Sequence, residues 1–336
     1  MSPKFVNKLT IVSFFLFASF IIFLLIKDNG RSYVNKINIF DNQNISWGKG
    51  WKNKKSYYSG SELRFSITNT KTISSKVSVP KLEPIQEMEI GIEGKFFYLS
   101  SPDLNKKELT IYLDKESYNK PQEVRIRYFC VWQFIPCEVT VESIFVDRSA
   151  KLLPPPNLPK TLAILGDSIS SNFGSQNFTG YLADHLGYQL HNASIYQSTI
   201  SKMGSGIDGV SRYKKDITDF KPEFVLIIMG ANDILKNIPV NEFGQSYKGV
   251  VEGIKKYSPK SKIISSGVFK SKALDSDIVD DFNNAIQKIA ISENIIYVDP
   301  SGWLSDGDFM DTIHPSIQAQ GKLEKGYFDV ISKITD

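Results

Sequence analysis

The sequence predicts an all-β domain followed by an α/β domain with a parallel sheet, preceded by one apolar segment. Three observations lead to this fold class. Residues 9–26 carry no charge, residues 31–150 contain short runs that alternate apolar and polar residues, and residues 151–336 alternate apolar runs with segments of helical length. A chain of 336 residues suffices for about two domains, each large enough to bury its own core.

The composition is that of an ordinary globular protein. Hydrophobic residues make up 41% of the chain and charged residues 23%, which excludes a collagenous, disordered or disulfide-dense protein. The formal net charge of +4, from 40 basic and 36 acidic residues, is too evenly balanced to predict a nucleic-acid partner. The sequence contains no metal-ligand cluster, phosphate loop or nucleotide fingerprint, so we expect no metal or cofactor.

The apolar segment at the N-terminus begins at Leu9 and ends at Ile26. As a helix rising about 1.5 Å per residue it would be roughly 27 Å long, enough for the core of a bilayer. Lys4 and Lys8 precede it and favour an N-inside orientation, and no small-x-small cleavage site follows it. We expect residues 1–30 to be a transmembrane anchor, with a cleaved secretion signal as the alternative. Both place the remaining chain outside the cytoplasm. An anchored chain would lie in the periplasm or at the cell surface, and a chain with a cleaved signal would be secreted.

Residues 31–150 predict a β sandwich of the jelly-roll-like type. Turn formers such as Ser59-Gly60 separate many short alternating runs, and no stretch of the region has helical periodicity. The runs are LRFSITN at 63–69, SSKVSV at 74–79, EMEIGI at 87–92, KFFYLS at 95–100, ELTIYL at 108–113, EVRIRYF at 123–129 and EVTVESIFV at 138–146.

The two cysteines of the chain lie between the last two of these runs. A hairpin would bring Cys130 and Cys137 together, and an oxidising compartment would allow them to form a disulfide. Two buried free thiols are the alternative. Their spacing matches no zinc site, because the chain has no second pair of cysteines.

Three consecutive prolines, Pro154 to Pro156, mark a stiff connector near the predicted domain boundary at residue 150. Beyond it, strands are expected at 161–165, 188–194, 224–229, 262–269 and 295–299. Helices are expected near 178–186, 206–219, 243–257, 275–293 and 315–333. Alternating strands and helices with nearly continuous apolar strands predict a parallel sheet covered by helices on both faces, so residues 151–336 form the second domain.

Polar blocks follow the predicted strands of the second domain, where active sites of open α/β sheets lie. The blocks are Gly166-Asp167-Ser168, Gly230-Ala231-Asn232-Asp233 and, before the last helix, Asp311-Thr312-Ile313-His314-Pro315. Together they contain every group that acyl transfer requires. A serine needs a base to remove its proton, and a histidine serves as that base when a carboxylate orients it. The backbone N–H of Ser168 and the amide of Asn232 are candidate donors to an oxyanion.

The three blocks, in this order and at these intervals, resemble the GDSL/SGNH hydrolase superfamily over residues 160–333. The resemblance implies a flavodoxin-like, three-layer α/β/α fold. It implies Ser168 as nucleophile, His314 as base, Asp311 as the carboxylate that orients His314, and Asn232 as an oxyanion donor. The stretch from Gly302-Trp303 to Asp311 is similar to SGNH carbohydrate esterases. The preceding β domain is similar to carbohydrate esterase family two, which places a jelly roll before its SGNH domain.

One block departs from the family pattern. Where the family has a glycine whose backbone N–H donates to the oxyanion, this chain has Gln197 at the end of Asn192-Ala193-Ser194-Ile195-Tyr196-Gln197. A backbone donor survives this substitution if the dihedral angles tolerate a Cβ, whereas a positive φ would strain the glutamine. We expect an intact but altered oxyanion hole. Three supporting residues complete the site: Asp167 in the loop of the nucleophile, and Gly230 and Asp233 in the turn of Asn232.

The leading interpretation is a serine esterase that removes acetyl or other short acyl groups from carbohydrate through an acyl-enzyme. Acylated oligosaccharide or polysaccharide is then the substrate. An extracytoplasmic glycan O-acyltransferase using the same residues is one alternative. A non-catalytic glycan-binding protein is another, because Gln197 departs from the family and a β domain is added. The sequence predicts no oligomeric state.

Overall fold

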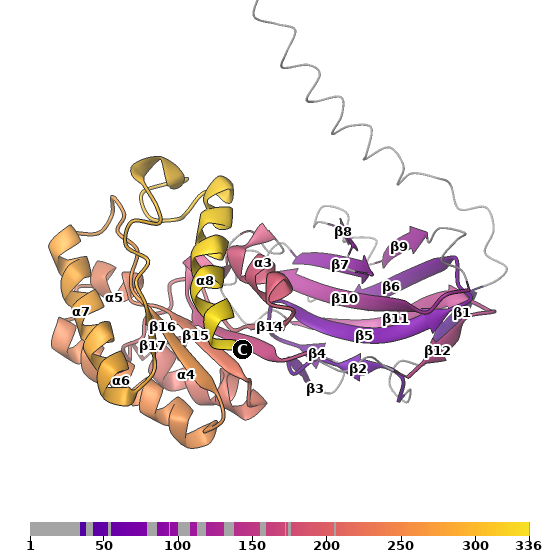
Figure 1. The fold of residues 1–336 in the computed structure, drawn as a ribbon, viewed down its shortest axis with the longest axis horizontal. Helices are drawn as coiled ribbons and strands as arrows, with labels where there is room; N and C mark the ends of the chain where they lie inside the picture. Colours follow the sequence, from indigo (N-terminus) through magenta and orange to yellow (C-terminus); the bar gives the residue numbers. More distant parts are fainter. Residues whose placement is uncertain are drawn as a thin grey trace, which may run out of the picture.

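The computed structural model describes two domains that lie side by side (Figure 1). The described residues are 34–37, 43–52, 55–78, 86–93, 95–99, 108–112, 119–130, 138–154, 159–171, 173, 176–204 and 206–335. The predicted membrane segment from Leu9 to Ile26 lies outside them. Among the helices that the structure describes, none is long and apolar enough to cross a membrane.

The first domain is built from two antiparallel sheets. One sheet contains β1 (Val34–Ile37), β3 (Trp51–Lys52), β4 (Lys55–Ser56), β6 (Thr72–Ser78), β9 (Glu108–Tyr112) and β11 (Val139–Asp147). The other contains β2 (Ser46–Trp47), β5 (Ser61–Thr68), β7 (Gln86–Ile92), β8 (Lys95–Leu99), β10 (Gln122–Cys130) and β12 (Lys151–Leu153).

The alternation along these strands determines how the two sheets pack. Leu63, Phe65 and Ile67 of β5 point to one face, and they share a buried core with Ile144 and Val146 from β11 of the other sheet. The expected all-β sandwich is therefore present. Its jelly-roll connectivity stays a prediction, because several connections between the strands lie outside the described residues.

The β domain ends with a strand that the sequence did not indicate. Lys151–Leu153 (β12) pairs with β5, so the antiparallel sheet continues just beyond the predicted boundary at residue 150. Of the two cysteines, Cys130 is fully buried at the end of β10 and is disulfide-bonded. Cys137 lies outside the described residues, so its pairing with Cys130 stays a prediction.

The second domain contains one parallel sheet with the strand order β14-β13-β15-β16-β17. Its strands are β13 (Thr161–Gly166), β14 (Gln189–Asn192), β15 (Phe224–Ile228), β16 (Lys262–Ser266) and β17 (Ile296–Val298). Its helices are α2 (Ser168–Ser171), α3 (Phe178–His185), α4 (Gly209–Asp216), η5 (Thr218–Phe220), α5 (Ala231–Leu235), α6 (Val240–Tyr257), α7 (Ser276–Glu293), η6 (Asp306–Asp308), η7 (Ile317–Ala319) and α8 (Gln320–Thr335).

The strand order explains how helices cover both faces of this sheet. The chain moves one way from β13 to β14 and the other way from β15 to β17, so right-handed crossovers place α3 on one face and α4, α6 and α7 on the other. The C-terminal helix α8 packs on α3 and thus joins the first face. The predicted parallel sheet is confirmed, and its order is the flavodoxin-like one that the resemblance implied.

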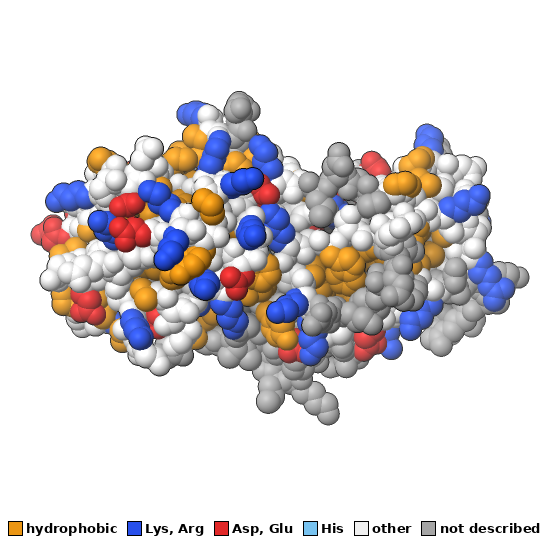
Figure 2. Space-filling model, turned by 90° about the horizontal axis from the view of Figure 1, so that it is seen from below, with side chains coloured by type: hydrophobic (Ala, Val, Ile, Leu, Met, Phe, Trp, Pro, Cys, Tyr) orange, Lys and Arg blue, Asp and Glu red, His pale blue; other side chains and the backbone are white. Residues whose placement is uncertain are grey.

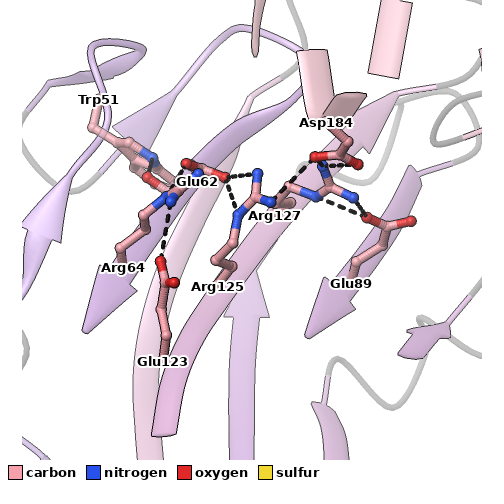
Figure 3. A network of polar contacts seen from close by, with 8 residues as sticks. All are labelled: Trp51, Glu62, Arg64, Glu89, Glu123, Arg125, Arg127 and Asp184. Atoms are coloured by element: carbon pink, nitrogen blue, oxygen red, sulfur yellow. Dashed lines mark hydrogen bonds and ion pairs between the residues drawn. The ribbon is translucent and has the colours of Figure 1, made fainter. Parts of the chain in front are cut away.

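The two domains meet where one sheet of the sandwich faces α3 and β14 (Figure 1). Figure 3 shows the charged network at this contact. Arg127 of β10 binds Glu89 of β7 at 2.6 Å and Asp184 of α3 at 2.7 Å, and its side chain is only 5% exposed. Arg125 joins Glu62 at 2.8 Å to the same Asp184 at 3.2 Å. The charges of Arg125 and Arg127 are therefore paired with carboxylates on both sides of the domain contact.

A second contact extends the sheet of the α/β domain. The edge strand β14 receives the backbone of Ser59, whose carbonyl oxygen accepts a hydrogen bond from the N–H of Asn192 at 3.0 Å. Lys49 binds Glu223 at 2.8 Å, and the other carboxylate oxygen of Glu223 accepts from the N–H of Thr161.

Figure 2 shows the face seen from below, where basic and acidic side chains are intermixed over the α/β domain.

Candidate active site

The site lies at the carboxyl edge of the parallel sheet. Because β13 lies between β14 and β15, the loops after these three strands meet there. Ser168 begins the short helix α2 directly after β13 and is 6% exposed. A Cβ at Gly166 would lie 2.0 Å from the Oγ of Ser170 and 2.6 Å from that of Ser194. Only glycine permits this close approach, so Gly166 allows the loops after β13 and β14 to pack together.

His314 comes from the loop after β17, the strand at the far edge of the sheet. Local contacts give this loop a fixed shape. Ser305 and Asp308 form a capping box, and Lys322 of α8 binds Asp308 at 2.7 Å. The hydrogen bond from Lys322 holds the pKa of Asp308 down to about 2. An isolated bridge between Phe309 and Pro315 closes the loop around the residues that lie between them.

The three residues of the expected Ser-His-Asp set are linked by two hydrogen bonds, with His314 in the middle. The Nε2 of His314 lies 2.9 Å from the Oγ of Ser168, and its Nδ1 lies 2.7 Å from the Oδ2 of Asp311. The other oxygen of Asp311 accepts from the backbone N–H groups of His314 at 2.6 Å and Ile313 at 2.8 Å. Residues 311–314 therefore form a turn in which the carboxylate of Asp311 points at the ring of His314.

The charge of Asp311 determines which ring nitrogen of His314 carries the hydrogen. Burial raises the pKa of Asp311, but the hydrogen bonds from His314 and Ile313 outweigh it and leave this pKa below its usual value. An ionised Asp311 can only accept, so Nδ1 of a neutral His314 carries the hydrogen. The lone pair on Nε2 then accepts from the hydroxyl of Ser168, which is the arrangement that a general base requires.

Gln197 adopts the left-handed conformation, with φ of 59°. The backbone at this position therefore has the geometry that favours glycine, and the glutamine is strained. Its side chain is exposed, and its backbone carbonyl oxygen accepts a hydrogen bond from Nζ of Lys236. Within the described residues, neither its N–H nor that of Ser168 donates to a protein acceptor. Both N–H groups are thus available to bind an oxyanion.

Asn232, the third expected donor, lies in the first turn of the short helix α5, which follows β15. Its Nδ2 donates to the carbonyl oxygen of Ser198 at 3.1 Å and to Oδ2 of Asp167 at 3.3 Å. Both amide hydrogens are therefore engaged, and the bond to Asp167 is the longer and weaker one. An oxyanion would take the place of Asp167 on this amide. Gly230 has φ of 134°, so the turn that presents Asn232 requires glycine.

Two buried carboxylates tie the loops of the site together. Asp167 accepts from the N–H of Ile169 at 3.0 Å, and Asp233 accepts from the N–H groups of Ile200 and Ser201 at 2.9 and 3.0 Å. Asp233 thus connects the turn of Asn232 to the loop that follows Gln197. Burial raises the pKa of Asp167 to about 7, against the hydrogen bond from Ile169 that lowers it.

The remaining histidines lie outside this constellation. His185 is exposed on α3 and binds Glu324 at 2.7 Å. His191 is buried on β14 with its Nε2 2.7 Å from the carbonyl oxygen of Asp216, and burial lowers its pKa to about 4. Trp303 is half-buried and packs edge-on against Tyr327 of the core at 4.9 Å. In the described part of the chain, no hydrogen bond links any of these three residues to Ser168 or His314.

Sequence reasoning missed two residues beside the site. The ring of Tyr196 stacks on that of His314 with centroids 6.0 Å apart. Arg212 of α4 is buried, and its Nη2 donates to the carbonyl oxygen of Gly166 at 2.7 Å. The sequence carries one signal for Arg212: it is an arginine on the face of a helix that packs inward. A buried guanidinium needs fixed hydrogen-bond partners, so an arginine at such a position indicates a structural role.

Residues 164–321 match the GDSL-like lipase/acylhydrolase family. The matched segment contains Ser168, Asn232, Asp311 and His314, so the resemblance that the polar blocks indicate is confirmed. A search of curated proteins gives no match.

Solved structures that resemble this one include both domains. Acetyl xylan esterase Est2A from the rumen bacterium Butyrivibrio proteoclasticus has a TM-score of 0.70 at 14% identity, over 90% of this chain and 99% of that one. A family two carbohydrate esterase from Clostridium thermocellum in complex with cellohexaose has a TM-score of 0.68 at 15% identity, over 87% and 99%. Salicylyl-acyltransferase SsfX3 from a tetracycline biosynthetic pathway has 0.67 at 11%, over 91% and 99%. These likenesses concern the fold.

The conformation of Gln197 gives a first prediction. Gln197→Gly should leave the free energy of unfolding unchanged or raise it by up to about 1 kcal/mol, because relief of a positive φ offsets the greater entropy of unfolded glycine. Gln197→Val should lower it by more than about 1 kcal/mol, since a β-branched residue fits this conformation poorly. Urea unfolding measures both.

Gln287→Gly is the matched control for this substitution. Gln287 is exposed within α7, where φ is helical, so glycine should cost about 1 kcal/mol there. An equal loss of stability in Gln197→Gly and Gln287→Gly would contradict strain at Gln197.

The raised pKa of Asp167 gives a second prediction. Since its folded-state pKa lies above the ordinary value, its contribution to stability is fully present below about pH 4 and is lost as the pH rises to about 7. Relative to Asp167→Asn, the wild type should lose up to roughly 4 kcal/mol of unfolding free energy across this window. Urea unfolding at a series of pH values measures this difference, and parallel curves for the two proteins would refute it.

Proposed function

Because residues 164–321 belong to the GDSL-like lipase/acylhydrolase family, we propose that this chain is a serine esterase that removes acetyl or other short acyl groups from carbohydrate. The observation that carries the proposal is the contact of 2.9 Å between Nε2 of His314 and Oγ of Ser168, with Asp311 on the other ring nitrogen. This arrangement prepares a serine for attack on an ester carbonyl.

The reaction proceeds through an acyl-enzyme. His314 takes the proton of Ser168 as Oγ bonds to the carbonyl carbon of the ester, and the protonated ring is stabilised by Asp311. When the tetrahedral intermediate collapses, the bond to the sugar oxygen breaks and that oxygen takes the proton from His314. A water then attacks the acyl group by the same route, which releases the carboxylic acid and restores Ser168.

The charge of the tetrahedral intermediate is bound by three donors. The N–H groups of Ser168 and Gln197 have no protein acceptor within the described residues, and the amide of Asn232 exchanges its weak bond to Asp167 for the oxyanion. Because negative charge develops on the ester oxygen only as the tetrahedral intermediate forms, the bond from this amide to that oxygen is stronger in the transition state than in the ground state.

The carbohydrate substrate is supported by the two-domain likeness to carbohydrate esterases, one of which was solved with cellohexaose. Acylated oligosaccharide or polysaccharide is accordingly the proposed substrate class. Transfer of the acyl group to a glycan hydroxyl is the second candidate function, since the salicylyl-acyltransferase has a similar fold over 91% of this chain.

We further propose that the chain acts outside the cytoplasm, anchored through the segment from Leu9 to Ile26. The apolar length of this segment supports the proposal. The chain should sediment with membranes after cell lysis and stay there in carbonate at high pH. A chain recovered in the soluble fraction with residues 1–30 removed would favour the cleaved signal instead.

Substitution of the nucleophile tests the esterase proposal. Ser168→Ala should lower kcat for p-nitrophenyl acetate by at least about 1000-fold with the fold intact, because no acyl-enzyme can form. Asp311→Asn should lower it by about 100-fold or more, since the ring of His314 loses its fixed tautomer. A fluorophosphonate probe should label the wild type and not Ser168→Ala.

The products distinguish the candidate functions. With an acetylated oligosaccharide and a second oligosaccharide present, release of acetate alone supports hydrolysis, and an acetylated second oligosaccharide supports transfer. A wild-type chain that the probe does not label, but that binds glycan, would overturn both enzymatic functions.

A further inference from the structure

One buried cation beside the site has no part in the steps above. Arg212 on α4 is 3% exposed, and its guanidinium faces backbone carbonyl groups more than carboxylates. Its Nη2 donates to the carbonyl oxygen of Gly166 at 2.7 Å, its Nη1 donates to that of Ala193, and its Nε donates to that of Ile207 at 2.9 Å. Its Nη2 also lies 3.2 Å from the Oγ of Ser198.

Two of these partners, Gly166 and Ala193, lie at the ends of the two strands β13 and β14, whose following segments supply the site. Gly166 is two residues before Ser168, and Ser198 directly follows Gln197. Ala193 directly follows β14. One planar group therefore fixes the distance between the segment of the nucleophile and the segment of an oxyanion donor. The fork of an arginine can hold two carbonyl groups at once, which the single ammonium of a lysine cannot do with the same rigidity.

Arg212 is in turn connected to the β domain. Its Nη1 lies 3.6 Å from Oδ2 of Asp216, one turn further along α4. The other oxygen of Asp216 accepts from the hydroxyl of Tyr58 at 3.2 Å, and Tyr58 is 8% exposed in the segment before β5. The ring of Tyr58 packs on that of His191 at 4.3 Å. The chain of contacts Tyr58–Asp216–Arg212 thus runs from the β domain to the site.

We propose that Arg212 is a positioning residue that sets the spacing of the nucleophile and oxyanion loops, and that Tyr58 of the β domain holds it through Asp216. The inference rests on the proposed esterase function and adds a role for the β domain within it. The β domain is then part of the active-site framework, whatever glycan it contacts. The neighbouring bond from the N–H of Asn192 to Ser59 fixes β14 at the same place.

Arg212→Lys and Tyr58→Phe test this role in the full chain. The lysine retains the charge but loses the fork, so kcat for p-nitrophenyl acetate should fall by about 100-fold, as a loop displaced by about 1 Å would cause. The phenylalanine removes one hydroxyl, and kcat should fall by about 10-fold. KM should change less than kcat in both variants, because the oxyanion is bound only in the transition state.

Arg127→Lys and Tyr128→Phe are the matched controls. Arg127 is a buried arginine of the domain contact, and Tyr128 is a buried tyrosine whose hydroxyl lies 3.1 Å from Ser75. The printed side-chain partners of the two, Glu89 and Asp184 for Arg127 and Ser75 for Tyr128, lie outside the described loops of the site, so both controls should lower Tm while kcat stays within about 2-fold of the wild type. Circular dichroism at the assay temperature verifies that every variant is folded.

The rate of labelling by a fluorophosphonate separates this inference from the proposed function. If the wild type reacts and the Arg212→Lys chain reacts about 100-fold more slowly, the inference is supported. If the wild type reacts and Arg212→Lys keeps its rate, or loses no more than Arg127→Lys at equal Tm, the inference is wrong while the esterase stands. A wild type that does not react overturns the esterase proposal and this inference with it.

Discussion

The hydrogen bond between His314 and Ser168 joins two segments that are 146 residues apart, and the proposed chemistry depends on the fold bringing them together. Ser168 follows a strand inside the sheet, whereas His314 follows the strand at its edge. The loop after β17 must therefore run along the carboxyl edge of the sheet and place His314 beside Ser168. Its capping box, its bridge and its contact with Lys322 hold this loop in position before any substrate binds, which lowers the entropy that binding would otherwise lose.

Buried and half-buried arginines have two different kinds of partner in the described part of this chain. Arg127 and Arg125 face carboxylates, and their network orients one domain against the other (Figure 3). Arg212 faces backbone carbonyl groups, those of Gly166 at the end of β13, of Ala193 after β14 and of Ile207 before α4. At the domain contact, each buried charge is paired with an opposite charge. At Arg212, one guanidinium donates hydrogen bonds to several carbonyl dipoles. The network of Arg127 lies at the contact of the two domains, and Arg212 reaches this contact at a different place, through Asp216 and Tyr58.

Much of the fold follows from the sequence because its periodicity is clear. The five strands of the parallel sheet and the five helices of eight or more residues in the α/β domain lie where apolar runs and helical segments predict them. The short helices α2 and α5 and the strand β12 were not predicted, since fewer than six residues show no period. The polar blocks predict the proximity of Ser168, His314 and Asp311. The partners of Arg212 could not be predicted, because tertiary contacts between strand ends leave no pattern in the sequence.

The position of Gln197 shows why a departure from a family motif need not remove a function. The conformation at this residue is the one that glycine adopts without strain, and the chain retains it with a side chain present. The strain is borne by a loop that Asp233 holds from one side, through Ile200 and Ser201, and Arg212 from the other, through Ser198. A backbone donor depends on where the loop is held and not on the side chain it carries. The framework around Gln197 therefore replaces the conformational freedom that glycine would have given.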